Sequence, residues 1–281
     1  MPELPEVETV VRGLRAIVIG KTIANVSLNA PKTSLVVSKS LRPLSFKSAL
    51  IGRTIQSVSR RGKNIIIALS GNLTLWVHLK MTGQFHWLDA AVRPDKHDLV
   101  MIRFAGDSKH ELRFHDYRRF GRLRIFRESE LAKQKGLGDL GPEPLEISPS
   151  EFVKLCYRRS RQIKQALLDQ TFIAGIGNIY ADESLYAARI HPRKLTTAIS
   201  RGKLIELHGH IRRLMKRAIA LMGTSVDTYA GVNGEPGAFQ KYLKVYGEEG
   251  NRCARCGHVI VREKIGSRSA HYCPNCQRRP K

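Results

Sequence analysis

The chain has 281 residues, of which 42% are hydrophobic, so it can build a packed core and is expected to form two domains, or one domain with a small module. Lys and Arg number 48 against 24 Asp and Glu, which gives a net charge of +24 spread along the chain. This excess favours a polyanionic partner, nucleic acid first, over a membrane surface. No stretch is apolar enough to predict a membrane span or a secretory signal, so we expect a cytoplasmic, nucleoid-associated protein.

The first eight residues, Met-Pro-Glu-Leu-Pro-Glu-Val-Glu, are unusual for a chain start. Removal of Met1 would leave Pro2 as a secondary amine that can attack an aldehyde-like carbon and form an iminium ion. An α-amino group titrates near ~8, so much of it would be neutral at physiological pH. The simpler interpretation is a helix entry, with Pro5 at the first position and Glu6 in the first turn. On this stretch alone the helix entry is favoured, although it leaves Pro2 and Glu3 unexplained.

Apolar side chains at helical spacing predict a helix over residues 5–19. The period then changes to two, which predicts strands at 22–28, 54–59, 64–69, 73–79, 84–88, 98–104, 111–116 and 122–126. About eight antiparallel strands favour a β-sandwich capped by the first helix. The fold class is therefore α+β, with the sandwich occupying residues 1–136.

A Gly- and Pro-rich stretch at residues 137–149 marks the expected domain boundary, and the helical period then returns. Helices are predicted at 149–158, 161–169, 178–188 and 200–222, the first of them opened by a capping box of Ser148 and Glu151. The polar, Gly-rich residues 224–238 are long for a connector and indicate a mobile or ligand-covering loop. We assign 137–247 to a helical domain and 248–281 to a separate small module.

Four of the five cysteines form two C-x2-C pairs with sixteen residues between the pairs: Cys253, Cys256, Cys273 and Cys276. In a reducing compartment this spacing predicts a four-thiolate zinc site. Too few residues surround it for a core of their own, so one structural Zn2+ would supply the folding energy of a small β-hairpin, with strands at 259–261 and 271–272. The remaining Cys156 is expected to be buried in a helix.

Three clusters combine basic residues or a helix start with glycine, at residues 60–63, 116–121 and 174–178. We expect the cations of the first to be exposed at a turn, and the third to present helix amides to an anion, with Asn178 as the cap. Each has an ordinary alternative: a solvated turn, Arg–Phe packing or a simple helix start. Met81 follows a strand and is by default a core residue. If exposed at a hairpin tip beside Arg118 and Phe120, it could enter a base stack.

These pieces occur in a fixed order along nearly the whole chain: Pro-Glu-Leu-Pro-Glu-Val-Glu-Thr (2–9), Arg-Gly-Lys (61–63), His-Leu-Lys-Met-Thr-Gly (78–83), Asp-Tyr-Arg-Arg-Phe-Gly (116–121), Gln-Thr-Phe-Ile-Ala-Gly-Ile-Gly-Asn-Ile-Tyr (170–180), Val-Tyr-Gly (245–247) and the four cysteines. In this the chain resembles the bacterial formamidopyrimidine-DNA glycosylases, also called 8-oxoguanine-DNA glycosylases. Two positions depart from the pattern: Tyr117, where many relatives carry proline, and Glu248, where a basic residue is usual.

The resemblance implies that Pro2 attacks C1′ of a damaged nucleotide, with Glu3 as the acid/base group and Glu6 as a helper near the amine. It also implies three further sets of site residues. Phosphate-binding positions are Lys63, His78, Asn178 and Arg268, of which Lys63 and Arg268 are also counted with the catalytic set. The void-filling trio is Met81, Arg118 and Phe120, with Arg119 and Tyr180 as further DNA-binding residues. Thr224, Ser225 and Tyr246 are assigned to the loop that closes over the extruded base, and residues 163–188 to a helix–two-turn–helix motif.

The implied activity is excision of oxidised purines from damaged double-stranded DNA by a monomer, through a Pro2 iminium and successive β- and δ-elimination. Zinc is expected to be structural and Mg2+ dispensable. Two alternatives stay open: an endonuclease VIII-like enzyme for oxidised pyrimidines, and a DNA-binding protein without catalysis. The Pro-Glu-Leu-Pro-Glu start argues against the former, which tends to have glycine after Pro-Glu. A chain that keeps Met1 is expected to bind DNA without chemistry.

Overall fold

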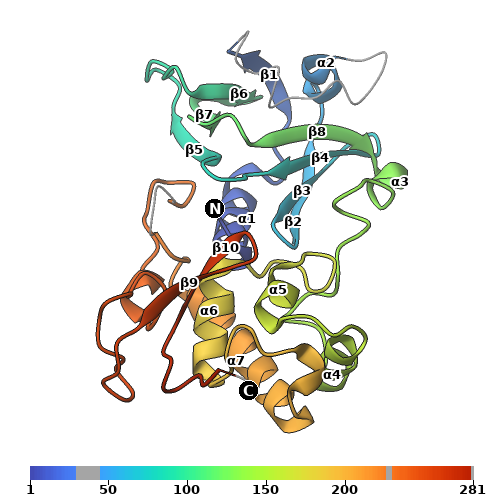
Figure 1. Cartoon of the computed structure of the whole chain (residues 1–281). Coiled ribbons are helices and arrows are strands. Elements are labelled where there is room, and N and C mark those ends of the chain that lie inside the picture. The colour runs from blue at the N-terminus through green and yellow to red at the C-terminus, as the bar shows by residue number, and fades with distance from the viewer. Residues whose placement is uncertain (30–44, 226–229, 280–281) are drawn as a thin grey trace. The chain divides into compact units, whose positions relative to one another are not determined.

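The computed structural model describes residues 1–29, 45–225 and 230–279 (Figure 1). Its contacts divide the chain into two compact units: Met1–Gly138 with Leu221–Ala238, and Asp139–Ala220 with Phe239–Lys281. Residues 221–238 follow a helix of the second unit in sequence, yet they cluster with the first. Among the described residues, no helix has both the length and the apolar character that crossing a membrane requires.

The first unit is built on two four-stranded antiparallel sheets that share one hydrophobic core with helix α1 (Leu4–Val18). One sheet has the order β1 (Ile23–Leu28), β6 (Asp98–Phe104), β7 (Asp107–His115), β5 (Gln84–Asp89). The other has the order β2 (Ile55–Arg61), β3 (Asn64–Leu69), β4 (Leu73–His78), β8 (Arg122–Arg127). The predicted helix-capped antiparallel β-sandwich is confirmed.

Helix α1 begins one residue earlier than predicted because Glu3 and Glu6 form a reciprocal capping box at its first turn. Its apolar stripe enters the core of the unit at Val7, Val10, Val11, Leu14 and Val18. Burial of each such side chain contributes about 1.5–3 kcal/mol, so the helix is fixed firmly against the sheets. The residues before it, which carry the proposed chemistry, therefore have a defined position.

The sequence missed two short helices in this unit, α2 (Phe46–Leu50) and α3 (Glu128–Leu131). Helices of four or five residues span little more than one turn, so no helical period can reveal them. Strand β7 also begins at Asp107, earlier than the predicted residue 111. Its polar first half pairs with β5 and β6 without the alternating pattern on which the prediction relied.

The second unit contains the four predicted helices: α4 (Pro149–Tyr157), α5 (Ile163–Leu168), α6 (Asn178–Ala187) and α7 (Arg201–Ala220). The two short 3-10 helices are η1 (Thr196–Ala198) and η2 (Phe239–Tyr242). The capping box of Ser148 and Glu151 opens α4 as expected. Cys156 is fully buried on α4, and burial raises the pKa of its thiol to about 12. Helices α5 and α6, joined by a turn at 170–172 and a bend at 173–175, form the predicted helix–two-turn–helix.

The hairpin near the cysteines lies elsewhere than predicted. Its strands are β9 (Val261–Ile265) and β10 (Arg268–Tyr272), not residues 259–261 and 271–272. Ile265 pairs with Arg268 across a two-residue turn, in which Gly266 takes a φ of 61° that L side chains rarely adopt. Side chains in β9 alternate between the two faces, a period of two that the charged residues at 262–264 conceal.

Candidate active site and nucleic-acid interface

Pro2 directly precedes a pair of buried acidic residues at the start of α1. Pro2 is buried, and Glu3 and Glu6 are only 3% and 2% exposed. The Glu3 amide donates to Glu6 Oε2 at 2.8 Å, while the Glu3 side chain accepts from the backbone of Glu6. The helix-entry interpretation and the catalytic interpretation of residues 1–8 therefore involve the same residues. The capping box that begins the helix also holds the proposed acid/base group beside the proposed nucleophile.

Glu6 ties the helix start to the segment predicted as a covering loop. The Thr224 amide donates to Glu6 Oε1 at 2.9 Å, and Gly223, at a φ of 82°, lies directly against the Glu6 side chain. Substitution of Gly223 by alanine would bring Cβ to 2.9 Å from the Glu6 side chain, so only glycine fits there. Glu6 therefore positions the two segments, whatever part it takes in proton transfer.

The base of the 224–238 segment is fixed at both ends. Gly237 donates to Ser225 Oγ at 2.8 Å, and Ala238 donates to the Leu221 carbonyl at 2.9 Å. Val232 is buried in the core of the first unit, and its carbonyl accepts from the Trp87 amide at 3.0 Å. Residues 226–229 lie outside the described part of the chain. The sequence anticipated a loop here but not its attachment to the β-sandwich unit.

Lys63 occupies the turn between β2 and β3, where Gly62 has a φ of 57°. Its side chain is buried, with 6% exposed, so the expectation of an exposed cation at this turn is wrong for Lys63. Arg60, near the end of β2, pairs with Glu8 of α1 at 3.2 Å and donates to the Gly62 carbonyl at 2.9 Å. These bonds draw the turn against the helix instead of leaving it in solvent.

His78, at the end of β4, lies among cations. Burial, with the positive charges of Lys80, Lys63 and Arg122 adding to it, lowers the pKa of His78 from 6.5 to about 3. The ring is therefore neutral at physiological pH. Its Nδ1 accepts from the Lys80 amide at 3.0 Å, which leaves the proton on Nε2. His78 is thus a neutral donor within a positive field, a suitable partner for a phosphate oxygen.

Met81 and the pair Arg118 and Phe120 lie on two separate turns. Met81 is half-buried between β4 and β5, which belong to different sheets, so it does not sit at a hairpin tip. Arg118 and Phe120 are exposed between β7 and β8, with the guanidinium 4.7 Å above the Phe120 ring. Both the cation–π contact and the exposure are therefore present, and an exposed ring of this kind could enter a base stack.

One buried carboxylate, Asp116, joins the two turns. It accepts from Thr82 Oγ1 at 2.5 Å, from the Gly121 amide at 2.7 Å and from the Arg118 amide at 3.2 Å. Asp116 is fully buried, and the backbones at Gly83 and Gly121 both lie close to the Phe114 ring. The sequence named Asp116 within a motif but assigned it no role. An Asp that opens a glycine-ended turn was the signal that it could have used, although only the fold reveals that this acid is buried.

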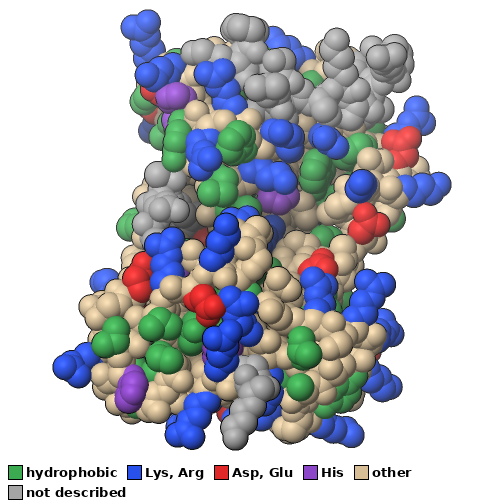
Figure 2. All heavy atoms as spheres, in the orientation of Figure 1, with side chains coloured by type: hydrophobic (Ala, Val, Ile, Leu, Met, Phe, Trp, Pro, Cys, Tyr) green, Lys and Arg blue, Asp and Glu red, His purple; other side chains and the backbone are tan. Residues whose placement is uncertain are grey.

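Arg119 itself takes a φ of 56° and is half-buried, while Arg122 supports its turn. The Arg122 guanidinium donates to the carbonyls of Phe120 at 2.8 Å and Gly121 at 2.7 Å. Figure 2 shows Lys and Arg side chains spread over the visible face of both units, with far fewer acidic ones. The predicted cationic surface is thus present in each unit.

In the second unit, the glycine loop before α6 forms as predicted, with one correction. Gly177 is the N-cap and Asn178 is the first helical residue, so Asn178 does not cap the helix. Gln170 fixes the loop, because its side chain accepts from the Gly175 amide and donates to the Ile176 carbonyl, both at 2.9 Å. Asn178 Oδ1 is buried without a hydrogen-bond partner among the described residues.

Asn178 and Arg268 line one hollow of about 380 Å³, together with Tyr246, Gly247, Glu249, Arg262, Ser267, Ser269 and His271. The N-terminal turn of the ten-residue helix α6 contributes Asn178, and the exposed start of β10 contributes Arg268. A helix N-terminus and guanidinium groups around one hollow suit an anion such as a phosphate. Sequence reasoning treated these two phosphate-binding positions separately, and the structure brings them together.

Two neighbouring buried acids on α6 hold this hollow in shape. Asp182 accepts from Lys164 Nζ at 2.5 Å and from the His271 amide at 2.9 Å, and Lys164 also donates to the Ser269 carbonyl at 2.5 Å. Lys164 and Asp182 are 0% and 1% exposed. Arg268 thus begins a strand that a buried ion pair attaches to α5 and α6. Sequence reasoning missed both residues, because nothing in the sequence shows that Lys164 is buried. Once its burial is known, a paired acid is expected, since a buried Lys is rarely unpaired.

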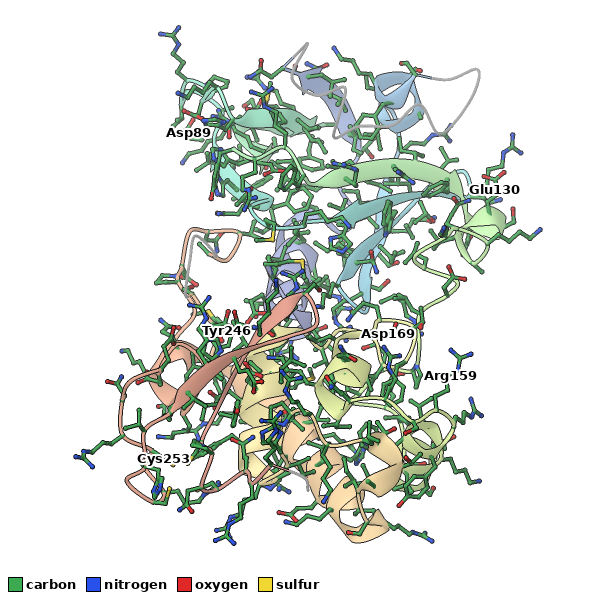
Figure 3. All side chains as sticks on the ribbon, in the orientation of Figure 1. Asp89, Glu130, Arg159, Asp169, Tyr246 and Cys253 are labelled. Carbon is green, nitrogen blue, oxygen red and sulfur yellow. The ribbon has the colours of Figure 1, made fainter. Side chains whose placement is uncertain are left out.

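The second acid, Glu183, fixes Tyr246. Its carboxylate accepts from the amides of Val245 and Tyr246, each at 2.9 Å, and burial raises its pKa despite these bonds. Tyr246, labelled in Figure 3, meets the His271 ring edge to face at 4.9 Å. In contrast, the Tyr180 side chain is fully buried against Phe239, with ring centres 5.8 Å apart. DNA binding by Tyr180 stays a prediction, and the buried ring packs within the core of its unit.

The four cysteine sulfurs converge, with all four Sγ atoms within 4.8 Å of one another. Sγ–Sγ distances are 3.9 Å for Cys253–Cys276 and 3.4 Å for both Cys256–Cys273 and Cys256–Cys276. Four thiolates at ~2.3 Å from one tetrahedral Zn2+ have edges of ~3.8 Å, so the site fits one zinc. Cys253, labelled in Figure 3, packs in a small core with Tyr186 and Val245, so a bound metal would link the module to α6.

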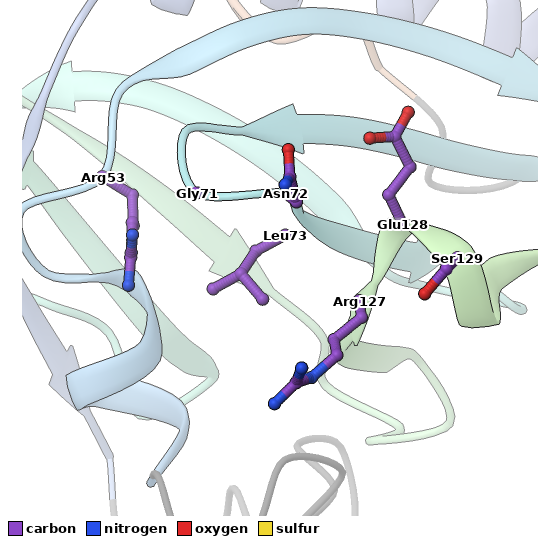
Figure 4. A pocket seen from close by; sticks show the side chains of 7 residues that line it. All are labelled: Arg53, Gly71, Asn72, Leu73, Arg127, Glu128 and Ser129. Atoms are coloured by element: carbon purple, nitrogen blue, oxygen red, sulfur yellow. The ribbon is translucent and has the colours of Figure 1, made fainter.

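A hollow of about 740 Å³ in the first unit is lined by other residues. Figure 4 shows its lining at the β3–β4 turn, with Arg53 and Arg127 pointing toward the space from opposite sides. It contains no residue that the sequence assigned to chemistry. Volume alone therefore does not identify the active site of this chain.

Comparison with known proteins agrees with this geometry along the whole chain. Three family models match: the formamidopyrimidine-DNA glycosylase N-terminal domain over residues 1–123, the H2TH domain of the same enzymes over 140–230, and a zinc finger found in FPG and IleRS over 250–279. The formamidopyrimidine-DNA glycosylase of Pelotomaculum thermopropionicum is 42% identical over 280 residues and covers 99% of both chains. That of Streptococcus pyogenes serotype M6 is 40% identical over 283 residues, again with 99% of both chains covered.

Solved structures of Lactococcus lactis Fpg give the same result. Its complex with abasic-site DNA aligns with a TM-score of 0.89 at 35% identity, covering 99% of this chain and 100% of that one. A complex of a mutant of the same enzyme with Fapy-dG DNA aligns with a TM-score of 0.88, also at 35% identity and with the same coverage. The match in sequence, domain order and fold is complete enough to conclude that the chain belongs to the formamidopyrimidine-DNA glycosylase family.

Proposed function

We propose that this chain is a bifunctional DNA glycosylase and AP lyase of base-excision repair, which removes oxidised purines such as 8-oxoguanine and formamidopyrimidines from duplex DNA. The observation that carries the proposal is the buried Pro2, which directly precedes the capping box of the buried Glu3 and Glu6 at the start of α1. The curated relatives are named for this activity, and the solved neighbours hold Fapy-dG or abasic-site DNA.

The reaction begins with extrusion of the damaged nucleotide, because its C1′ atom cannot be reached within the stack. The Pro2 lone pair attacks C1′, and the bond from C1′ to the base breaks with its electron pair leaving on the base. The Pro2 nitrogen then loses its proton, which neutralises the departing base and restores the nitrogen lone pair. The sugar ring then opens as Glu3 protonates O4′, and the nitrogen lone pair forms the C1′=N⁺ iminium. These steps need Met1 to be absent and the Pro2 nitrogen to be neutral.

The iminium withdraws electrons from C2′, so a base can remove a C2′ proton. That electron pair expels the 3′-phosphate by β-elimination, and a second proton loss expels the 5′-phosphate by δ-elimination. Water finally hydrolyses the iminium and restores the Pro2 amine. All of these reaction steps are carried out by protein residues. A zinc ion held by Cys253, Cys256, Cys273 and Cys276 would only stabilise the fold.

We assign DNA contacts to the residues that each unit presents. Lys63 and His78 in the first unit, and Asn178 and Arg268 in the second, are proposed to bind phosphates flanking the lesion, with Lys63 and Arg268 supporting the chemistry. Met81, Arg118 and Phe120 would fill the gap left by the base, with Arg118 facing the opposite cytosine and Arg119 on the backbone. Thr224, Ser225 and Tyr246 would bound the extruded base.

The division into 1–136, 137–247 and 248–281 remains our prediction for folding modules. Nucleoid association is likewise proposed, because the substrate is chromosomal duplex DNA and the net charge is +24.

Lesion range needs its own measurement. One Lactococcus lactis Fpg structure that aligns with this chain holds DNA with an oxidised pyrimidine, so binding of such a lesion would not separate the two enzyme classes. We expect this chain to excise 8-oxoguanine faster than an oxidised pyrimidine when both are placed opposite suitable partners. Faster excision of the pyrimidine would favour the endonuclease VIII-like alternative.

The proposal is tested with Glu3→Gln on an 8-oxoguanine duplex. We expect the variant to bind the duplex normally and to release base at least ~100-fold more slowly, since a positioned acid/base group contributes about that much. Glu130→Gln changes an exposed glutamate of the same unit and should leave the rate unchanged. Base release by Glu3→Gln at the wild-type rate would contradict the role of Glu3. Normal binding without any base release by the Met1-free protein would favour the non-catalytic alternative.

A further inference from the structure

We propose that, in addition to the four-cysteine site of the second unit, the chain has a metal site in the first unit, formed by His86, Asp98 and His115. These residues lie on β5, β6 and β7, which are neighbours in one sheet in the order β6-β7-β5. Each offers one ligand atom, and the three atoms all lie within 4.8 Å of one another. The cluster shares no residue with the four-cysteine site or with the proposed chemistry at Pro2.

The geometry of the side chains suits a shared ion. The His86 and His115 ring centres are 5.3 Å apart, and His115 Nδ1 lies 3.0 Å from Asp98 Oδ1. With metal–nitrogen bonds of ~2.1 Å, two imidazoles on one tetrahedral ion have centres ~5 Å apart. A small inward movement of the three side chains would bring all three ligand atoms to bonding distance.

Outer partners hold Asp98 in the orientation that a ligand needs. Its Oδ2 accepts from Arg113 Nη1 at 3.2 Å and from the Asp95 amide at 2.9 Å, which leaves Oδ1 toward His115. Arg113 is in turn paired with Glu111 at 2.8 Å. Such outer hydrogen bonds are the usual support of a ligating carboxylate. Glu111 is shared with Arg103, whose half-exposed side chain pairs with it at 2.9 Å.

Access from solvent also favours binding. The Asp98 side chain is only 4% exposed, but that of His115 is 21% exposed, so an ion can enter from solvent. His97 packs edge to face with His115 at 5.7 Å, and its buried Nδ1 has no hydrogen-bond partner within the described part of the chain.

The donor set indicates the class of ion. Two imidazole nitrogens and one carboxylate oxygen suit Zn2+, Co2+ or Ni2+, whereas Mg2+ and Ca2+ prefer oxygen ligands. Water would complete the coordination. The ion would cross-link three strands of the sheet, next to the turn at Asp116, whose amide donates to the His97 carbonyl at 3.0 Å.

The test is metal stoichiometry of the full-length protein, dialysed against buffered Zn2+ and then against Co2+. We expect one more metal per chain than the four cysteines account for, with a Co2+ absorption spectrum distinct from that of a four-thiolate site. His86→Gln and His115→Gln should each lose the additional ion or bind it roughly tenfold or more weakly, while they keep the cysteine-bound metal.

His110→Gln is the matched control, because His110 of the same unit also contacts a carboxylate, Asp107, at 3.0 Å but lies in no three-ligand cluster among the described residues. It should retain the additional ion. The proposal is overturned if the wild-type protein binds a single metal per chain at millimolar Zn2+. It is equally overturned if His86→Gln and His115→Gln bind the second ion as tightly as His110→Gln. Glycosylase activity does not enter this test, so it fails or succeeds independently of the proposed function.

Discussion

Glu6 illustrates how one side chain can serve both folding and function. One carboxylate oxygen closes the capping box with Glu3, and the other accepts from Thr224 of a segment more than two hundred residues later in the chain. The local sequence pattern predicted the helix entry, and the family resemblance implied that Glu6 is a helper near the Pro2 amine. It could not identify the Thr224 bond, because nothing local specifies a pairing at that separation.

His78 gives a prediction for pH dependence. Its pKa is lowered to about 3, mainly by burial, so the unfolded chain takes up the proton first as pH falls. Its contribution to stability is complete above pH ~6.5 and decreases as pH falls toward ~3, by up to ~1.4 kcal/mol per pH unit. Denaturant titrations from pH 7 to 4 should show a shallower decrease for His78→Gln than for the wild type. Equal slopes for His78→Gln and the wild type would contradict the assignment.

Thr82→Val tests whether Asp116 positions the two turns. The substitution removes the 2.5 Å bond to a fully buried carboxylate, so we expect unfolding to become easier by about 1–3 kcal/mol. Affinity for a lesion duplex should fall as well, because Met81 would no longer be held in register with Arg118. Thr9→Val removes only a bond to the Pro5 carbonyl within α1 and serves as the control. The same loss of lesion affinity in both variants would exclude a specific role for Asp116.

At the scale of elements, the β10 strand depends on helices α5 and α6. The buried Lys164–Asp182 pair and the bonds from Asp182 to His271 hold the strand that begins with Arg268. Lys164→Met would leave a buried carboxylate uncompensated, at a cost of about 3–5 kcal/mol. Chemical denaturation should show this loss, and phosphate-dependent DNA affinity should fall with it.

The surface pair of Lys203 and Glu206 provides the comparison, with Lys203 44% exposed. Lys203→Met should cost no more than about 1 kcal/mol, because water screens the pair. If Lys164→Met were as stable as Lys203→Met, the buried pair could not be what holds β10. A double replacement of Lys164 and Asp182 by apolar residues should recover part of the lost stability, since no charge then remains buried.

The sequence predicted the helices and strands better than it predicted the tertiary contacts between them. Helices with long apolar stripes, such as α1 and α7, were placed within a few residues of their observed ends. The β9–β10 hairpin was misplaced because its strand period is carried by charged residues, and α2 and α3 are too short to show one. Lys63 was expected at an exposed turn and is buried, while Tyr180 packs against Phe239, a neighbour distant in sequence that no local pattern could specify.

At the scale of the whole molecule, the ordered motifs and the charge of +24 were enough to predict a nucleic-acid enzyme. The cysteine spacing predicted the zinc site, and the four converging sulfurs agree with it. The supporting acids Asp116, Asp182 and Glu183 were not predicted. An acidic residue in a strongly basic chain can equally lie on the surface, so only the fold reveals that these three are buried.

Removal of zinc should abolish DNA binding through loss of structure. Residues 248–279 have a small apolar core around Cys253 and Cys273, so the metal supplies much of their folding energy. We expect a thiol-competing zinc chelator to release the metal, lower the melting temperature and eliminate binding to an 8-oxoguanine duplex. Removal of Mg2+ alone should change nothing. A stable, zinc-free protein with full activity would show that the module does not depend on its metal.

The central claim is that the Pro2 amine forms a covalent bond with the sugar of the damaged nucleotide. Borohydride reduction during reaction with an 8-oxoguanine duplex, followed by peptide mapping, tests it most directly. We predict one protein–DNA adduct, located on Pro2, in protein from which Met1 has been removed, and none in protein that retains Met1. An adduct on a lysine, or equal trapping by the Met1-bearing protein, would contradict it.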